Sequence, residues 1–594
     1  MRSAWASLSS TWCIWRRNLK VTDYIAKDLY RRGVRTVFEL SGGMITHLLN
    51  SLYEAQQIRI LSMHHEQAAA FAADATGRMT GVPGVAMATS GPGATNLLTG
   101  IGSCYFDSSP AVFITGQVNR WELRNDRKIR QLGFQETDIV QMARPITKAA
   151  WQITSPEEVP RKLEKAFSLA MTGRPGPVLL DIPMDIQRYD IQEPPPFDEL
   201  PAEAGVSASD HVAILDDLLV TLKNSKKPLI LAGGGIRAGN AVEAFRRFVR
   251  KTGVPVVNSL LAMDLLPYDD PQRIGMIGTY GNRWANLALA ASDLLIVLGS
   301  RLDVRQTGSD VEFFRTNRTI FHVDCEAGEI NNRVTGCRAF VGGVKQFIAM
   351  AEAKIENEIL PHNAEWLNEI NALRSRYSDL TEIPPAEGIN PNWFVHQLCA
   401  ASYAAGAYTV DVGQHQMWAA QSSEVRGEQR WITSGGMGSM GFALPAGIGA
   451  TIAMGLRPVV VIAGDGGFQC NLQELQTVVR NDLPIKIVVM NNRCHGMVRQ
   501  FQESYFEGRY QSTLWGYDAP DFVHVASSYG ISGCRVELVE QVEEGLAELW
   551  KDPASPFLLE VGIDTFTNAY PKIAFGLPLN QMEPKSKPIA MEGT

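Results

Sequence analysis

What the chain has little of narrows its possible functions. Its 594 residues include only eight cysteines, none in a C-x-x-C pair, so we expect reduced thiols in a cytoplasmic compartment and neither a disulfide framework nor a zinc finger. The chain has 55 basic and 63 acidic residues, and its net charge of -8 would not attract the negatively charged backbone of a nucleic acid. No apolar run is long enough to cross a bilayer. Neither nucleic acid nor a membrane is therefore an expected partner.

The first twenty residues differ in composition from the rest of the chain. Residues 1–20 contain three tryptophans and four basic residues but no acidic residue, and serines interrupt their apolar runs. A secretory signal needs an unbroken apolar region, so we interpret this segment as an N-terminal extension. A short organellar leader is the alternative.

Beyond that segment, the chain predicts three domains. Its length exceeds one hydrophobic core and corresponds to about three to four domains of roughly 150 residues. Short β-branched apolar runs alternate with amphipathic stretches of helix length, which predicts α/β domains with doubly wound parallel sheets. We place the domains at residues 21–190, 209–352 and 390–570, the linkers at 191–208 and 353–389, and a C-terminal tail at 571–594.

The apolar runs also predict individual strands. The predicted strands cover residues 35–40, 85–90, 111–117 and 177–183 in the first domain, 228–235, 255–260, 293–300 and 319–324 in the second, and 408–413, 459–464, 485–491 and 557–563 in the third. A Ser-Gly turn follows an apolar run at residues 90–93 and again at 434–437. This echo suggests that the first and third domains are related and face one ligand.

The most informative motif lies in residues 459–492. An apolar strand runs into Gly-Asp-Gly-Gly at 464–467, and 24 residues separate Gly466 from Asn-Asn at 491–492. Glycines let the backbone approach an anion closely, and the N-terminus of a helix expected near Leu472 would present N–H groups to phosphate. A carboxylate, an amide oxygen and a backbone carbonyl are ligands that suit Mg²⁺. The motif therefore predicts a site for magnesium and a diphosphate.

This motif resembles the signature of thiamine-diphosphate-dependent enzymes. Residues 90–97, 134–138, 173–177, 411–418 and 431–441 further resemble the acetolactate synthase (acetohydroxyacid synthase) large subunit, and the similarity runs from about residue 19 to 584 in the same order. The resemblance implies a transferase of the carboligase type that uses thiamine diphosphate and Mg²⁺. It would decarboxylate pyruvate and add the two-carbon unit to a second 2-keto acid, as in branched-chain amino acid biosynthesis.

The resemblance also implies roles for individual residues. Glu66 matches the glutamate beside the aminopyrimidine, which in the family reaches the cofactor of a neighbouring subunit, so a homodimer or homotetramer is implied. The other candidate catalytic residues are Gly42, Phe134 and Gln135, which would lie over the thiazolium, and Met440, which would hold the cofactor bent. A surface carboxylate is the alternative for Glu66, but its alanine-rich surroundings are too apolar for a solvated face.

The same transfer gives the candidate cofactor ligands. Residues expected at thiamine diphosphate are Pro92, Asn96, Val412, Gly413, Gln414, His415, Gly438, Met440, Gly464, Asp465, Gly466, Gly467, Asn492, Gly496, Met497 and Val498. The expected metal ligands are Asp465, Asn492 and the carbonyl oxygen of Cys494.

A flavin is the third cofactor that the resemblance implies. Its expected contacts are Arg174, Gly233, Gly234, Gly235, Arg301, Asp303, Arg305 and Asp324. Tyr280 stands where the family usually has histidine, and Gly343 where it often has an acidic residue. We expect FAD in a structural role, and an empty or ADP-binding central domain is the alternative.

Two departures from the family leave the acceptor substrate open. Phe501 replaces the usual tryptophan, and residues 118–132 form a longer, basic segment. The alternatives are therefore acetyl transfer to another acceptor, such as a nucleotide-linked keto-sugar, or a simple 2-keto-acid decarboxylase. A non-catalytic paralogue would be expected to lose Glu66, Asp465 or Asn492, and all three are present. A regulatory small subunit is a further partner that the resemblance allows.

Overall fold

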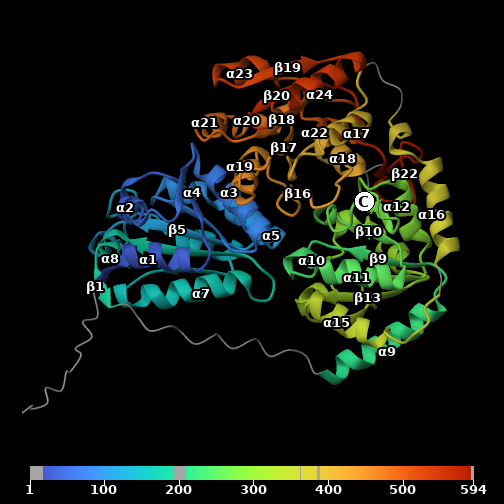
Figure 1. Ribbon diagram of the computed structural model, residues 1–594, viewed down its shortest axis with the longest axis horizontal. Coiled ribbons are helices and arrows are strands. Elements are labelled where there is room, and N and C mark those ends of the chain that lie inside the picture. The colour runs from blue at the N-terminus through green and yellow to red at the C-terminus, as the bar shows by residue number, and fades with distance from the viewer. Residues whose placement is uncertain (1–17, 193–207, 362, 384–387, 590–594) are drawn as a thin grey trace, which may run out of the picture.

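The computed structural model describes residues 18–192, 208–361, 363–383 and 388–589. Most of the expected N-terminal extension and of the first linker, Pro384-Pro385 of the second linker and the last five residues lie outside these ranges. Three α/β domains are present, each built on a six-stranded parallel sheet, so the predicted fold class is confirmed. Figure 1 shows the first domain in blue, the central one in green and the third in orange to red.

The first and third sheets have the same strand order. The first has the order β3-β2-β4-β5-β7-β6 and the third β16-β15-β17-β18-β20-β19, so both read 2-1-3-4-6-5 when their strands are counted along the chain. Their strands are β2 (Thr36–Leu40), β3 (Arg59–Ser62), β4 (Gly84–Ala88), β5 (Ala111–Gln117), β6 (Ala149–Gln152) and β7 (Pro177–Pro183), and β15 (Ala407–Val410), β16 (Arg430–Thr433), β17 (Val459–Gly464), β18 (Ile485–Asn491), β19 (Ser532–Val536) and β20 (Phe557–Gly562).

This shared order agrees with the expected relation between the first and third domains. The turn at residues 90–93 follows β4, the third strand of its domain along the chain, whereas the turn at 434–437 follows β16, the second strand of its own. The topological counterpart of 90–93 is the Gly-Asp-Gly-Gly turn at 464–467, after β17. The two Ser-Gly turns therefore do not occupy equivalent positions, and such turns recur wherever a backbone must turn sharply.

The central sheet has a different order, β11-β10-β9-β12-β13-β14, or 3-2-1-4-5-6 along the chain. Its strands are β9 (Pro228–Ala232), β10 (Val256–Asn258), β11 (Arg273–Met276), β12 (Leu294–Leu298), β13 (Thr319–Asp324) and β14 (Arg338–Val341). Ligands of sheets with this order bind beyond the carboxyl ends of the strands, where the order reverses. That point lies between β9 and β12.

Helices close both faces of every sheet. The first domain carries α1 (Val21–Arg31), α2 (Thr46–Ala55), α3 (Glu66–Thr80), α5 (Leu98–Asp107) and α7 (Val159–Met171); the central one α9 (Ala208–Asn224), α11 (Val242–Thr252), α12 (Arg283–Ala291) and α15 (Val344–Lys354); the third α17 (Pro391–Ala401), α18 (Gln414–Ser422), α19 (Ala443–Ala453), α22 (Gly496–Tyr505) and α24 (Val542–Trp550). The helix α16 (Ala364–Arg376) packs on α12.

A single apolar core joins the first and third domains. It contains Phe38 and Phe113 of the first sheet together with Val461 and Ile487 of the third, all fully buried. Between the sheets, α3 packs against α19, and small residues allow the close approach: a Cβ on Gly449 would lie 2.1 Å from the backbone oxygen of Ala72. The relative position of these two domains is thus set by packing.

Two short antiparallel ribbons tie down chain ends. The strand β1 (Asn18–Lys20) pairs with β8 (Asp190–Gln192), which closes the first domain. In the tail, β21 (Lys572–Ile573) pairs with β22 (Met582–Glu583). Arg283 of α12 donates to the Glu382 carboxylate at 2.5 and 2.7 Å and to the backbone oxygens of Met582 and Glu583, so one buried guanidinium holds linker and tail to the central domain. Among the described helices, none combines the length and the apolar character that a membrane span requires.

A histidine between two carboxylates fastens the second linker to the third domain. His396 of α17 lies 2.9 Å from Asp379 Oδ2 in the linker and 2.8 Å from Glu424 Oε1. Burial disfavours the imidazolium, but the two carboxylates outweigh that cost and raise the pKa of His396 above its ordinary value of 6.5. This junction therefore contributes stability fully below about pH 6.5 and loses it as the pH rises through the raised pKa.

We expect His396→Gln to lower the melting temperature most at pH 5.5, with a difference from the wild type that shrinks toward pH 8.5. The reason is that only the charged imidazole gains from both carboxylates. Calorimetry at several pH values measures the difference. A difference independent of pH would contradict the assignment.

Candidate active site

Three oxygen atoms from the Gly-Asp-Gly and Asn-Asn segments lie close together at the carboxyl ends of two inner strands of the third sheet. Asp465 follows β17 and Asn492 follows the neighbouring β18. Asn492 Oδ1 lies 3.3 Å from Asp465 Oδ1 and 2.9 Å from the backbone oxygen of Cys494. Turning the amide over would let its NH₂ group donate to both oxygens; with the oxygen on this side, the three atoms form a hard-oxygen set that fits Mg²⁺. Among the described residues, no group of three or more His, Cys, Asp or Glu side chains could hold a metal ion.

The environment of Asp465 is buried and includes a residue that no sequence motif marked. Only 3% of Asp465 is exposed, and burial raises the pKa of its carboxyl group to about 6. The Tyr517 hydroxyl donates to Asp465 Oδ2 at 2.8 Å. The helix after the motif, α20 (Asp465–Gln469), begins at Asp465 itself and not near Leu472, because the glycines take part in its first turn. A 3₁₀ turn and α21 (Leu475–Arg480) follow.

Residues 412–415 border the same site. They follow β15, the strand that pairs with β17 on the side away from β18. Asn492 Nδ2 donates to Gln414 Oε1 at 2.9 Å, and a Cβ on Gly496 would lie 1.9 Å from the same oxygen, so only glycine fits there. His415 is buried, which lowers the pKa of its imidazole to about 3, and its Nε2 has no hydrogen-bond partner. A neutral ring with an unpaired buried nitrogen fits a hydrogen bond to a bound anion.

The segment with Gly438 and Met440 is fixed at both of its ends. We call residues 434–441 the cofactor loop. At its start, Asp107 of α5 accepts hydrogen bonds from the backbone N–H groups of Gly435 (3.0 Å) and Gly436 (2.6 Å). At its end, Asp411 accepts from Gly441 N at 3.0 Å and from Ala443 N. Neither aspartate was assigned a role from the sequence: Asp411 is the first residue of the recognised segment 411–418, and nothing in the sequence marks Asp107.

The predicted residues of the first domain also gather, at the carboxyl ends of its central strands. Glu66 is the first residue of α3, is 5% exposed, and accepts a hydrogen bond of 2.9 Å from Asn96 Nδ2. A Cβ on Gly93 would lie 3.1 Å from Glu66 Oε1, and Pro92 begins the short helix α4 (Pro92–Asn96). The structure therefore brings Glu66 and Asn96 to the 90–93 turn.

Gly42 and Gln135 border the same turn. A Cβ on Gly42 would lie 2.5 Å from Thr89 Cβ, and Gln135 adopts a left-handed backbone with φ of 66° against Gly91. Phe134 is 79% exposed. Among the described residues, no hydrogen bond joins the Glu66 cluster to the Asp465 cluster within one chain.

A separate cavity lies over the switch point of the central sheet. The empty space at this cavity, about 1330 Å³, includes a part that is open to solvent. A Cβ on Gly233 would lie 2.0 Å from the backbone oxygen of Gly299, so the backbones after β9 and β12 approach closely. The predicted flavin contacts that line the cavity are Arg174, Gly234, Gly235, Arg301, Asp303, Arg305 and Asp324, and Tyr280 and Gly343 line it too.

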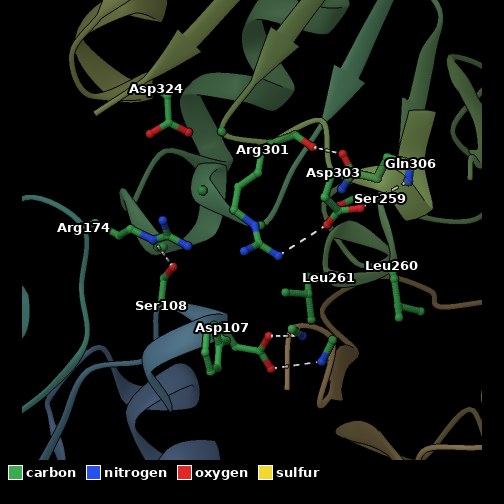
Figure 2. A pocket seen from close by; sticks show the side chains of 18 of the residues that line it. Asp107, Ser108, Arg174, Ser259, Leu260, Leu261, Arg301, Asp303, Gln306 and Asp324 are labelled. Carbon is green, nitrogen blue, oxygen red and sulfur yellow. Dashed lines mark hydrogen bonds and ion pairs between the residues drawn. The ribbon is translucent and has the colours of Figure 1, made fainter. Parts of the chain in front are cut away.

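The charged groups of this cavity are arranged around one space (Figure 2). Arg301 pairs with Asp303 at 3.3 Å, and burial raises the pKa of Asp324. Arg174 pairs with two glutamates of the central domain and donates to Ser108 Oγ at 2.8 Å. Arginines, a buried aspartate and a close glycine turn are a donor and acceptor set that fits a dinucleotide such as FAD.

The two departures noted in the sequence lie on exposed surfaces. Phe501 of α22 is half-exposed and packs 4.7 Å from the Tyr505 ring, in the helix that begins with Gly496, Met497 and Val498. The basic segment is folded around Glu136, whose carboxylate accepts from the backbone N–H groups of Arg124 (2.6 Å) and Leu132 (2.7 Å). Residues 126–132 of that segment are exposed.

Comparisons with known proteins cover nearly the whole chain. Residues 19–142, 215–350 and 411–561 match the families described as "Thiamine pyrophosphate enzyme, N-terminal TPP binding domain", "central domain" and "C-terminal TPP binding domain". The "Acetolactate synthase large subunit" of Parasynechococcus marenigrum (strain WH8102) is 37% identical, over 93% of this chain and 89% of the relative. The "Acetolactate synthase isozyme 2 large subunit" of Escherichia coli (strain K12) is 36% identical, over 94% of this chain and 98% of the relative. "Acetolactate synthase, chloroplastic" of Arabidopsis thaliana is 35% identical, over 95% of this chain and 84% of the relative.

Proposed function

Because this chain belongs to the acetolactate synthase family of thiamine pyrophosphate enzymes, we propose that it decarboxylates pyruvate and transfers the two-carbon unit to a second 2-keto acid. The observation that carries the proposal is the convergence of the Asp465, Asn492 and Cys494 oxygens, in a chain that also places Glu66 against Asn96. The first set would hold Mg²⁺ and, through it, the diphosphate. Bound thiamine diphosphate supplies a nucleophilic ring carbon and an electron sink for the decarboxylation.

The residues of the chain would bind, orient and move protons around that group. Glu66 would exchange a proton with the aminopyrimidine, and the hydrogen bond from Asn96 orients its carboxylate for that exchange. Met440 would contact the cofactor from the third domain, whereas Glu66 belongs to the first. Gln135 would hydrogen-bond a substrate carbonyl, and Phe134 would supply an apolar wall that excludes water from the site.

The oligomeric state belongs to the same proposal. Glu66 and Asp465 lie in separate clusters of one chain, and Phe134 is largely exposed, so we place each complete site between two chains of a homodimer or homotetramer. The free cysteines among the described residues support a reducing, cytoplasmic compartment. A regulatory small subunit remains compatible with this assembly.

FAD is proposed for the cavity of the central domain. The close glycine turn, Arg174, Arg301 and Asp324 support a dinucleotide there. No step of the carboligation transfers electrons to or from a protein group, so the flavin would act as a structural ligand that fills the space between the domains. An ADP moiety alone would use the same glycine turn.

A second candidate keeps the pyruvate half-reaction and changes the acceptor. The exposed basic segment at 126–132 would attract an anionic acceptor, such as a nucleotide-linked keto-sugar. Phe501, smaller than tryptophan, would leave more room beside α22.

Product analysis with pyruvate, thiamine diphosphate and Mg²⁺, with and without FAD, tests these alternatives. We expect acetolactate and carbon dioxide in a ratio near one to one, because two pyruvates give one of each. Carbon dioxide with acetaldehyde and no acetolactate would contradict the carboligase assignment. Acetyl transfer only after addition of a nucleotide-linked keto-sugar would favour the second candidate.

A further inference from the structure

We propose that Asp107 is a positioning residue for the thiamine site: it fixes the cofactor loop and couples that loop to the central cavity. The inference rests on the proposed function, because the loop carries Met440. Asp107 itself touches no reacting atom. It acts through the backbone of the loop, and it belongs to a different domain from the one that holds the diphosphate motif.

The Asp107 carboxylate is fully buried at the end of α5, and each of its oxygens receives a backbone N–H group of the loop. Oδ1 accepts from Gly436 at 2.6 Å, Oδ2 accepts from Gly435 at 3.0 Å, and Arg78 Nη2 is also 3.0 Å from Oδ2. Hydrogen bonds to an ionised acceptor are shorter and stronger than those between neutral groups. The first turn of the loop is therefore held by two such bonds.

The charge balance explains why these bonds cannot be given up easily. Arg78 bonds both oxygens of Asp74, at 2.6 and 2.8 Å, and donates to the backbone oxygen of Thr433. The Arg78 guanidinium is thus shared between two buried carboxylates. The N–H groups of the loop add to its stabilisation of the ionised Asp107 carboxylate. Burial raises the pKa of Asp107, as expected for a carboxylate whose countercharge is shared.

The far end of the loop is held by Asp411, whose carboxylate accepts a hydrogen bond from Gly441 N at 3.0 Å. Within the loop, the Ser434 hydroxyl accepts from Ser439 N at 3.1 Å, which ties the start of the loop to the residue before Met440. Only residues 437–440 lie between the two anchored ends. A shift at Gly435 or Gly436 is therefore passed to Met440 over a few residues, since the other end is fixed.

The same anchored turn forms a wall of the central cavity. Asp107, Gly435 and Gly436 line the cavity together with Ser108 and Leu261. Figure 2 shows the two hydrogen bonds of Asp107 as dashed lines at the edge of the cavity, below Arg174 and Arg301. A ligand in the cavity contacts one side of this turn, and the thiamine site begins at its other end. Filling the cavity would hold this turn in place and so tighten thiamine diphosphate binding. Because coupling between two ligands is reciprocal, bound thiamine diphosphate would tighten binding in the cavity by the same factor.

Asp107→Asn tests the role, with Asp74→Asn as the matched control. Both variants remove one buried carboxylate from Arg78, but only the first removes an acceptor from the loop. We expect Asp107→Asn to raise the Kd of thiamine diphosphate at least about tenfold and to remove the gain in affinity that FAD produces in the wild type. The KM for pyruvate at saturating cofactor should stay within about twofold, and Asp74→Asn should keep the wild-type Kd even though it melts earlier.

Hydrogen exchange of the protein without cofactors provides a readout independent of turnover. A peptide over residues 434–441 should exchange at least about tenfold faster in Asp107→Asn and not in Asp74→Asn. If Asp107→Asn does not fold, Asp107→Glu, which keeps the charge near Arg78, should change exchange and affinity in the same direction. A wild type that binds no thiamine diphosphate would refute the proposed function, whereas a binding wild type with unchanged Kd and exchange in the variant would refute this inference alone.

Discussion

Glu66→Gln is expected to lower kcat by about 10²–10⁴-fold, because glutamine cannot exchange a proton with the aminopyrimidine. The amide keeps the shape of the carboxylate and can still bond the Asn96 side chain, which donates to Glu66 Oε2 at 2.9 Å. The fold and the Kd of thiamine diphosphate should therefore change little. Steady-state kinetics at saturating cofactor, together with a binding titration, separates the two effects.

Asp74→Asn is the matched control for this variant. It also neutralises a buried carboxylate of α3, two turns further along, but Asp74 contacts Arg78 and Ser103 and neither Asn96 nor the 90–93 turn. Its kcat should stay within a few fold of the wild type. Near-normal turnover of Glu66→Gln would remove Glu66 from the mechanism.

Asp465→Ala should weaken the binding of Mg²⁺ and thiamine diphosphate together, by at least about 100-fold. Loss of an outer-shell partner alone costs about 10–100-fold in metal affinity, and Asp465 would be a direct ligand. The remaining oxygens of Asn492 and Cys494 carry no formal charge, so little would hold a divalent cation. Titration of the cofactor at several Mg²⁺ concentrations measures both constants.

Two further variants should show a smaller loss of affinity and no loss, respectively. Tyr517→Phe removes the hydroxyl that donates to Asp465 Oδ2 but keeps the carboxylate, so we expect a loss of about 10-fold. Asp518→Asn, at the exposed neighbouring position, should bind like the wild type. Undiminished diphosphate affinity in Asp465→Ala would overturn the metal assignment.

The strands that the sequence predicted are the four inner strands of each sheet, and the two that it missed in each are the edges. The inner strands are apolar runs because both faces are covered; β5 and β18, for example, are buried along their whole length. Edge strands are more exposed: the residues of β3 and β6 are mostly half-buried. Their mixed composition does not differ from that of a loop.

The site was predictable to the extent that it consists of local motifs. Asp465, Asn492 and Glu66 follow strands in recognisable segments, and the structure places Asp465 beside Asn492 and Glu66 beside Asn96. Asp107 and Tyr517 act by contacts across long stretches of sequence, 328 residues in the case of Asp107 and Gly435. No pattern within one segment carries such information. The topological equivalence of the turns at 90–93 and 464–467 was not predictable for a related reason, because strand order is a property of the whole sheet.

The packing of α3 on α19 has a consequence for how the chain is assembled. Each of these helices follows the second strand of its sheet, and the two sheets share one strand order. Equivalent elements therefore meet at the contact, as they do in the isologous interface of a two-fold symmetric dimer. Here the two halves are covalently joined, so self-complementary helix surfaces fix their orientation, and the central domain and its linkers can vary without disturbing it.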